Sequence, residues 1–321
     1  MTATPSAPLK GALLALLSFA LFSTHDVIVK SLGGIYAPFQ IIFFSVMFSF
    51  PLLSLKMIGE RDDGNLRPVH PWWTALRTGS GVMASLSAFY AFSVLPMAQT
   101  YAILFSSPLL ITVLAIPVLG ETVRLRRWAA VIVGLIGVVI VLRPGEAALG
   151  LGHLAALGCA VFGALSSVVV RKIGRDERSA VLLIYPLLTN FVLMGALLPF
   201  VYKPVPLLHL GGFAAMSVLA FLAMLCLIFA YRQAEAAVVA PMQYSQIIWA
   251  VIFGALFFGE SLDTATAVGV SIVIGSGLYI VFREGRTDAS ENTPVLRTRA
   301  WPGAAFVPRI AALLERSRRG P

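Results

Sequence analysis

The sequence predicts an all-α membrane protein in which ten transmembrane helices form two inverted five-helix repeats around a central cavity. Three observations indicate this fold: a highly apolar composition, ten separate apolar runs, and an internal repeat of about 140 residues. Hydrophobic residues make up 58% of the 321 residues and charged residues only 12%, about half the share in soluble domains. A soluble fold this apolar could not cover its own surface, so lipid must solvate much of the chain.

Ten apolar runs are bounded by charged residues, Pro or Gly, and their lengths suit membrane-spanning helices. The expected spans are Lys10–Val29, Ala37–Lys56, Trp72–Val94, Met97–Leu119, Arg127–Leu142, Gly150–Val170, Ala180–Val201, His209–Tyr231, Ala236–Phe258 and Thr264–Phe282. His25 and Asp26 interrupt the first run, which favours a retained helix over a cleaved signal. Cys159 and Cys226 lie inside apolar runs, so neither a disulfide framework nor a cysteine-rich metal site is expected.

Positive charge is distributed unevenly between the alternate loops of this arrangement. With the N-terminus in the cytoplasm, 20 of the 24 Lys and Arg residues fall on the cytoplasmic side, three fall on the opposite side, and Arg77 lies inside the third span. Loops rich in Lys and Arg stay in the cytoplasm. The sequence therefore predicts a multi-pass protein of a bacterial-type inner (plasma) membrane with both termini cytoplasmic. The net charge of +9 largely reflects this asymmetry, so no nucleic-acid partner is expected.

Two halves of the chain repeat each other at a nearly constant offset. Leu119-Gly120-Glu121-Thr122 ends the fourth span, and Phe258-Gly259-Glu260-Ser261 ends the ninth span 139 residues later. Upstream, Tyr90-Ala91-Phe92 matches Phe229-Ala230-Tyr231 at the same offset. Several matches in order at one offset indicate an internal duplication.

The duplication predicts the domain boundaries and the relation between the halves. A cytoplasmic N-terminus at 1–9 precedes a first five-helix repeat at 10–143, a second repeat follows at 150–283, and a basic cytoplasmic tail occupies 284–321. Because five is odd, the second repeat must cross the membrane in the opposite sense to the first. Inverted repeats recur in secondary transporters, where two inverted halves exchange inward-open and outward-open shapes.

The Gly-Glu-Thr/Ser turn that ends the fourth span of each half, within ten spans in five-helix halves, resembles the drug/metabolite transporter superfamily and its EamA-type branch. The resemblance covers roughly residues 10–285. It implies a basket of helices around a central cavity, lined mainly by the first four spans of each half, with the fifth and tenth spans packed behind. Members export amino acids, including aromatic ones, or move other metabolites and drugs, and this chain is similar to the amino-acid exporters.

Polar and aromatic residues inside the spans are candidates for the transport site, because a polar group in hydrocarbon is costly. Asp26 suits either a proton site or a contact to a substrate amine, with a structural hydrogen bond as the alternative. At the 139-residue offset Ser107 matches Gln246, so related helices carry paired polar positions, which also suits interhelical packing. The predicted substrate-binding or cavity residues are His25, Asp26, Tyr90, Gln99, Tyr101, Phe105, Ser107, Gln243, Tyr244, Gln246 and Trp249.

Other intramembrane residues receive structural interpretations. Pro108 and Pro241 remove backbone hydrogen bonds inside spans, so they are hinge candidates or fixed bends. Arg77 is expected to reach the headgroups along its flexible side chain, with a cavity role as the alternative. Glycines in the fifth and tenth spans are expected to permit close helix packing; they are Gly134, Gly137, Gly269, Gly275 and Gly277.

The function predicted from these observations is secondary transport. The preferred substrates are exported amino acids, above all aromatic or large apolar ones, moved by alternating access; a nucleoside, an S-adenosylmethionine-like metabolite or a drug cation is the alternative cargo. A membrane-embedded receptor or scaffold is the alternative outside transport. No enzyme, cofactor or metal site is expected, because HExxH, GxSxG and phosphate-loop patterns are absent from the sequence. The expected partners are a small-molecule substrate and the lipid bilayer, with proton coupling or facilitated diffusion, in a monomer or weak dimer.

Overall fold

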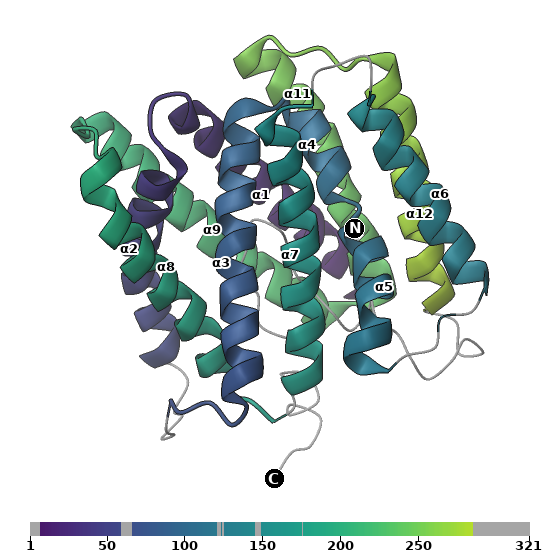
Figure 1. The fold of residues 1–321 in the computed structure, drawn as a ribbon, viewed down its shortest axis with the longest axis horizontal. Coiled ribbons are helices and arrows are strands. Elements are labelled where there is room, and N and C mark those ends of the chain that lie inside the picture. Colours follow the sequence, from purple (N-terminus) through teal and green to yellow (C-terminus); the bar gives the residue numbers. More distant parts are fainter. Residues whose placement is uncertain are drawn as a thin grey trace, which may run out of the picture.

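A computed structural model of the chain describes residues 7–58, 66–120, 123, 125–144, 149–174 and 176–284. Helices follow one another in a single bundle (Figure 1). They are α1 (Ala7–Gly33), α2 (Pro38–Ile58), α3 (Pro71–Val94), α4 (Met97–Leu104), α5 (Ser107–Leu119), α6 (Leu125–Leu142), α7 (Leu151–Ile173), α8 (Ser179–Val201), α9 (Leu207–Gln233), α10 (Ala236–Val239), the 3-10 helix η1 (Ala240–Ser245), α11 (Gln246–Phe258) and α12 (Thr264–Glu284).

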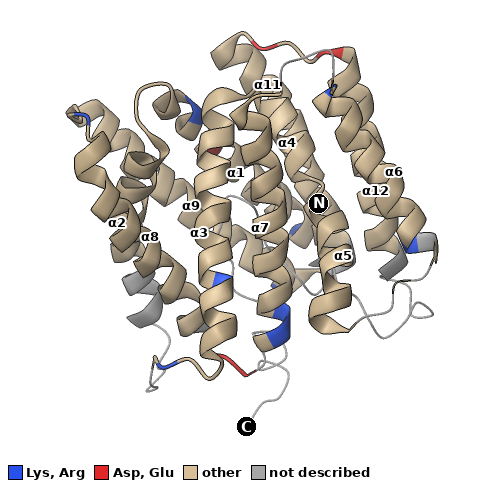
Figure 2. Ribbon diagram, in the orientation of Figure 1, with Lys and Arg blue, Asp and Glu red and all other residues tan. Residues whose placement is uncertain are grey.

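These helices correspond in position to the ten predicted spans, because α4 and α5 together make up the fourth, and α10, η1 and α11 make up the ninth. In the described part, seven segments are both long and apolar enough to cross a bilayer, and two further apolar helices are shorter. Charged residues gather toward the two ends of the bundle, and its middle contains few of them (Figure 2). The chain is a multi-pass membrane protein, and the predicted fold class is confirmed.

The backbone repeats itself between the halves where the sequence repeats. α5 begins at Ser107 and α11 begins at Gln246, 139 residues later, each after an interruption of the span. Both helices end at a glycine in the left-handed region, Gly120 with φ 71° and Gly259 with φ 63°. Glycine adopts this conformation without the steric cost that a Cβ would bring, which explains the repeated Gly-Glu pair. The fourth and ninth spans are thus interrupted at Pro108 and Pro241, where the sequence predicts a hinge or a fixed bend.

The fifth and tenth spans, α6 and α12, pack against each other at one side of the bundle (Figure 1). A Cβ on Gly137 would lie 2.9 Å from the Gly269 carbonyl oxygen, and one on Gly134 would lie 2.4 Å from the Ser276 hydroxyl. Gly277 lies against the Tyr244 ring in the same way. The close-packing prediction is wrong only for Gly275, where a Cβ would meet nothing within 4 Å.

One end of the bundle, named here the Lys30 end, contains the last turn of α1 and the first turn of α2. There the Lys30 ammonium lies 2.9 Å from a Glu260 carboxylate oxygen, and the other oxygen accepts the Met97 backbone N–H at 2.8 Å. Glu260 belongs to the Gly-Glu pair of the second half, so its carboxylate holds the first half at the start of α4. The corresponding Glu121 lies outside the described residues.

The opposite end, named here the Lys172 end, contains the last turn of α7. Glu177, in the connection from α7 to α8, accepts the His70 backbone N–H at 2.6 Å at the start of α3. Each end therefore has a carboxylate from the second half that accepts a backbone N–H at the start of a helix in the first half. The predicted N-terminal segment 1–9 and tail 284–321 lie almost wholly outside the described residues.

Candidate substrate cavity

A cavity lies between α1, α2 and α3 of the first half and α8 and α9 of the second half. Its polar lining consists of neutral side chains and one imidazole; these residues are His25, Ser45, Ser49, Ser85, Asn190 and Ser217. Its aromatic lining consists of Phe22, Phe89 and Phe221. Among the described residues that line the cavity, there is no Asp, Glu, Lys or Arg.

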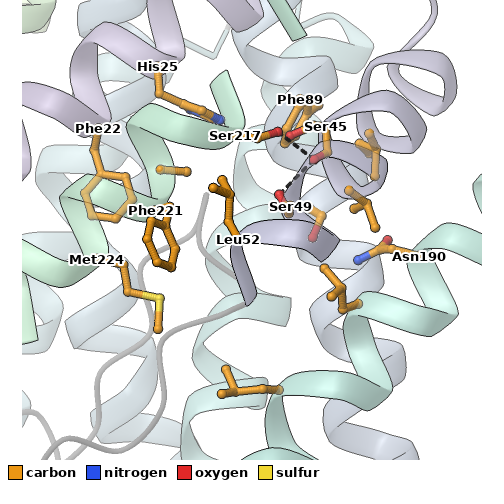
Figure 3. A pocket seen from close by; sticks show the side chains of 16 residues that line it. Phe22, His25, Ser45, Ser49, Leu52, Phe89, Asn190, Ser217, Phe221 and Met224 are labelled. Atoms are coloured by element: carbon orange, nitrogen blue, oxygen red, sulfur yellow. Dashed lines mark hydrogen bonds between the residues drawn. The ribbon is translucent and has the colours of Figure 1, made fainter. Parts of the chain in front are cut away.

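Two aromatic rings and the Asn190 amide lie on opposite sides of the cavity (Figure 3). Phe22, Phe221 and Met224 gather on one wall, and Asn190 points into the cavity from the other. Between them, the Ser45 carbonyl oxygen accepts the hydroxyls of Ser49 at 2.8 Å and Ser217 at 2.7 Å. An aromatic wall that faces neutral hydrogen-bonding groups suits a flat solute with polar edges.

Asn190 is one of the lining residues that sequence reasoning missed. Its side chain is 0% exposed, and neither amide atom has a hydrogen-bond partner in the described part of the chain. It lies on the same face of α8 as the lining residues Leu183 and Leu187, at helical spacings of seven and three residues. The available signal was a single carboxamide in an otherwise apolar run.

His25 connects the cavity to a buried carboxylate. Its Nδ1 lies 2.8 Å from one Asp26 oxygen, and the Tyr101 hydroxyl donates to the other oxygen. Asp26 is 1% exposed and Tyr101 is fully buried, so both lie behind the wall that His25 presents. The three side chains form a chain of hydrogen bonds that starts at the cavity and ends on α4, the first part of the interrupted fourth span.

Contacts of α2 and the residues just before it with α9 and the α8–α9 connection lie between the cavity and the Lys30 end. The Tyr36 hydroxyl lies 2.7 Å from the His209 Nδ1, and the Gln40 amide makes two hydrogen bonds with the Lys203 backbone, at 2.7 and 2.9 Å. The rings of Phe44 and Phe213 stack beneath them with their centroids 5.1 Å apart. In the other direction the lining continues along α2 and α8 to residues such as Leu52 and Leu183.

Of the predicted site residues, all within the described ranges, only His25 lines the cavity. Several others, from the fourth and ninth spans, lie near the helix interruptions. Phe105 and Tyr244, at equivalent positions of the repeats, contact each other with ring centroids 5.1 Å apart. The Ser107 hydroxyl donates to the Leu104 carbonyl at 2.7 Å. Gln246 is 0% exposed, and its amide has no hydrogen-bond partner among the described residues.

The remaining predicted residues lie apart from the cavity lining. The Gln99 amide contacts His153 Nε2 at 3.1 Å, and Trp249 packs on Phe253 with centroids 5.6 Å apart. Tyr90 and Gln243 are partly buried. The hinge candidates lie at the interruptions, as Pro108 is in the first turn of α5 and Pro241 is in η1.

Arg77 differs from its predicted arrangement. The side chain is 3% exposed in α3, so it does not extend toward the surface as snorkelling would require. Its backbone carbonyl accepts the Ser166 hydroxyl of α7 at 3.4 Å, which joins the third and sixth spans. No group of three or more His, Cys, Asp or Glu side chains that could hold a metal ion occurs within the described ranges.

Comparison with known proteins gives this cavity a family context. The chain is 26% identical to an S-adenosylmethionine uptake transporter of Rickettsia prowazekii, over 88% of this chain and 96% of that protein. It is 27% identical to a riboflavin transporter of Rhizobium johnstonii, over 88% and 95%, and 30% identical to one of Vibrio cholerae, over 74% and 80%. These relatives are not amino-acid exporters, so they give no support to the predicted amino-acid specificity.

A solved crystal structure shares the fold, with a TM-score of 0.56 at 18% identity, covering 83% of this chain and 94% of that one. The model of the EamA-like transporter family matches residues 9–143 and 150–283, one match for each five-helix half. The family consists of transporters, in agreement with the prediction that the chain is not an enzyme. The chain belongs to the EamA-like transporter family.

Proposed function

We propose that the chain carries a small metabolite with a planar nitrogen-containing aromatic ring through the central cavity. S-adenosylmethionine and riboflavin, the solutes of its named relatives, share this feature, since one contains adenine and the other a flavin ring. The observation that supports the proposal is the cavity itself, where an aromatic wall faces neutral hydrogen-bonding groups. Ring stacking adds about 0.5–1.5 kcal/mol per pair, enough for recognition without the tight binding that slows release.

Amino acids are the competing cargo. A zwitterion brings a carboxylate and an ammonium group into the site, and each buried charge requires a partner. The described lining offers a single ionisable group, the His25 imidazole, and no carboxylate or basic side chain. A neutral ring-containing solute such as riboflavin therefore matches the lining better than an amino acid does, and S-adenosylmethionine, which carries a zwitterionic methionine group, matches it through its adenine ring alone.

The proposed orientation places both termini in the cytoplasm and the Lys30 end outside. The uneven distribution of Lys and Arg supports it. In this orientation the contacts of Tyr36 with His209 and of Gln40 with Lys203 close the outer side. Reporter fusions after Arg67, Arg175 and Arg286 should then read cytoplasmic, and a fusion after Lys203 external. Reversed results at any two of these sites would contradict the orientation.

Coupling to protons is the proposed energy source, with facilitated diffusion as the alternative. The hydrogen-bonded series His25, Asp26 and Tyr101 supports it, because two ionisable groups adjoin the cavity there. A carboxylate inside a membrane-spanning segment commonly marks a proton or solute pathway. We further propose that one chain, as a monomer or weak dimer, suffices, since one chain supplies all the walls of the cavity.

The test is uptake by purified protein in proteoliposomes, with labelled riboflavin and labelled S-adenosylmethionine, each with and without an imposed pH gradient. Unlabelled adenosine, uridine, Phe, Trp and Thr serve as competitors. We expect saturable uptake of at least one ring-containing solute, competition by other rings, and no competition by Thr. Competition by Phe and Thr alone would instead support an amino-acid carrier.

A further inference from the structure

We propose that the Asn190 carboxamide recognises the hydrogen-bonding edge of the transported ring and determines which ring-containing solutes are accepted. This inference rests on the proposed function and names the specificity residue within that cavity. Asn190 lies near the middle of α8, and its amide points into the cavity (Figure 3). Its side chain is 0% exposed, and its nitrogen and oxygen both have no hydrogen-bond partner in the described part of the chain.

The orientation of α8 is set by residues other than Asn190. Leu183 and Leu187 line the cavity on the same face. Leu188 and Val192 are 49% and 57% exposed on the opposite side of the helix, where lipid replaces water as their solvent. Apolar residues on both faces thus keep α8 in a rotation that points the Asn190 amide toward the cavity. A different rotation could have placed this amide against a neighbouring helix, where it could form hydrogen bonds.

An unpaired buried amide is unusual in a native structure. Most buried polar side-chain atoms have at least one hydrogen-bond partner, and an exception calls for a functional or structural explanation. Structural polar residues in membrane helices act by bonding to a neighbouring helix, which Asn190 does not do within the described ranges. A solute that enters the cavity and hydrogen-bonds to both amide atoms would remove the free-energy cost of burying this amide without partners.

Three of the four serine hydroxyls in the lining already donate to backbone carbonyls. The hydroxyls of Ser49 and Ser217 donate to the Ser45 carbonyl, and the Ser85 hydroxyl donates to the Gly81 carbonyl at 2.9 Å. His25 Nδ1 is engaged with Asp26. The Asn190 side chain is the lining group that offers an adjacent donor and acceptor together.

Such a pair matches the edge of a nitrogen heterocycle. Carboxamides bond adenine through its amino group and the neighbouring ring nitrogen. The flavin ring carries an N–H beside a carbonyl, which offers the same pairing with donor and acceptor exchanged. Because a carboxamide can turn about its last bond, Asn190 can meet either edge. The Phe22 and Phe221 rings on the facing wall can then cover the face of the ring.

The experiment compares matched solute pairs in proteoliposomes. Riboflavin is paired with 3-methylriboflavin, in which a methyl group replaces the edge proton, and adenosine is paired with N6,N6-dimethyladenosine as competitors. The variants are Asn190→Leu, which keeps the branched shape but removes the hydrogen-bonding atoms, and Asn190→Ser, a smaller polar change less harmful to folding. Thr189→Val is the control, because Thr189 adjoins Asn190 in sequence but does not line the cavity.

We expect the wild-type protein to prefer the unmethylated member of at least one pair by about ten-fold in KM or inhibition constant. Asn190→Leu should raise the KM or inhibition constant of the unmethylated solute by about ten-fold, so that the preference falls to less than two-fold. Thr189→Val should leave the wild-type preference unchanged. Full preference in Asn190→Leu overturns the inference and leaves the proposed function standing. If Asn190→Leu does not fold, full preference in Asn190→Ser has the same meaning. Failure of the wild-type protein to bind or carry any of these rings overturns both.

Discussion

α1 and α7 occupy equivalent places in the two halves, yet only α1 brings ionisable groups to the centre of the protein. His25 and Asp26 correspond to Ser166 and Ser167 at an offset of 141 residues. Asp26 bonds to Tyr101, which the other half replaces by Ala240 at an offset of 139. The Ser167 hydroxyl instead donates to the Gly163 carbonyl of its own helix at 2.8 Å.

The two halves share backbone features but differ in the ionisable side chains of their first helices. Both halves keep an interrupted span followed by a helix that ends in a left-handed glycine. These features concern the backbone, which two inverted halves must share to exchange conformations. The His25–Asp26 pair beside the cavity occurs in the first half alone, so we infer that the motion is symmetric and its coupling is not.

The largest effect is expected from Asp26→Asn, which removes the charge and keeps the shape. Transport should fall at least ten-fold, because the charge that holds His25 and Tyr101 is lost. Folded yield should change little, since the amide can still accept the Tyr101 hydroxyl. Initial uptake rates in proteoliposomes between pH 5.5 and pH 8.5, alongside size-exclusion profiles, would measure both.

Ser167→Ala is the matched change in the other half and should alter the rate less than two-fold. Wild-type rates in Asp26→Asn across the whole pH range would refute a role in coupling. Loss of folded protein would assign Asp26 a structural role instead. Equal losses in Asp26→Asn and Ser167→Ala would remove the asymmetry between the halves.

The sequence was informative about features that depend on long stretches or on backbone geometry. Apolar run length gave the ten spans, and the Gly-Glu pairs gave the repeat that appears as two left-handed glycines. Pro108 and Pro241, predicted as hinges or fixed bends, lie where the two spans are interrupted. Such features follow from local chemistry, namely the cost of a missing N–H and the steric freedom of glycine.

The cavity lining was much harder to predict. Lipid-facing and protein-facing sides of a membrane helix are both apolar, so periodicity does not reveal how a helix is rotated. Ser45 and Ser49 could as well have been interhelical contacts as cavity residues. Gln99 was predicted to line the cavity, but it lies near the end of its span and contacts His153 away from the cavity. Rotation of α2 and α8, and with it the place of Asn190, required the three-dimensional structure.

A smaller effect is expected at the paired positions Gln246 and Ser107, where the interrupted spans resume. Gln246→Leu should reduce transport roughly five-fold without lowering stability, because its buried amide has no partner among the described residues and costs about 1–3 kcal/mol. Ser107→Ala should reduce transport less than two-fold, as it removes one bond to the Leu104 carbonyl. Uptake rates and melting temperatures in detergent would test both. A fall in the melting temperature of Gln246→Leu would mean that the amide already has a stabilising partner.

The smallest effect on transport, and the closest similarity between the halves, is expected at Gly120 and Gly259. A Cβ at either position would meet nothing within 4 Å, so Gly→Ala adds only the cost of the left-handed conformation, about 1–2 kcal/mol. Each single variant should lower the melting temperature by roughly 2 °C, and transport should change less than two-fold. Gly275→Ala is the control, because this helical glycine also has free space and alanine favours a helix by up to about 1 kcal/mol. A large loss of transport in only one of the two variants would show that the left-handed turns differ in function, and the motion would then be asymmetric as well.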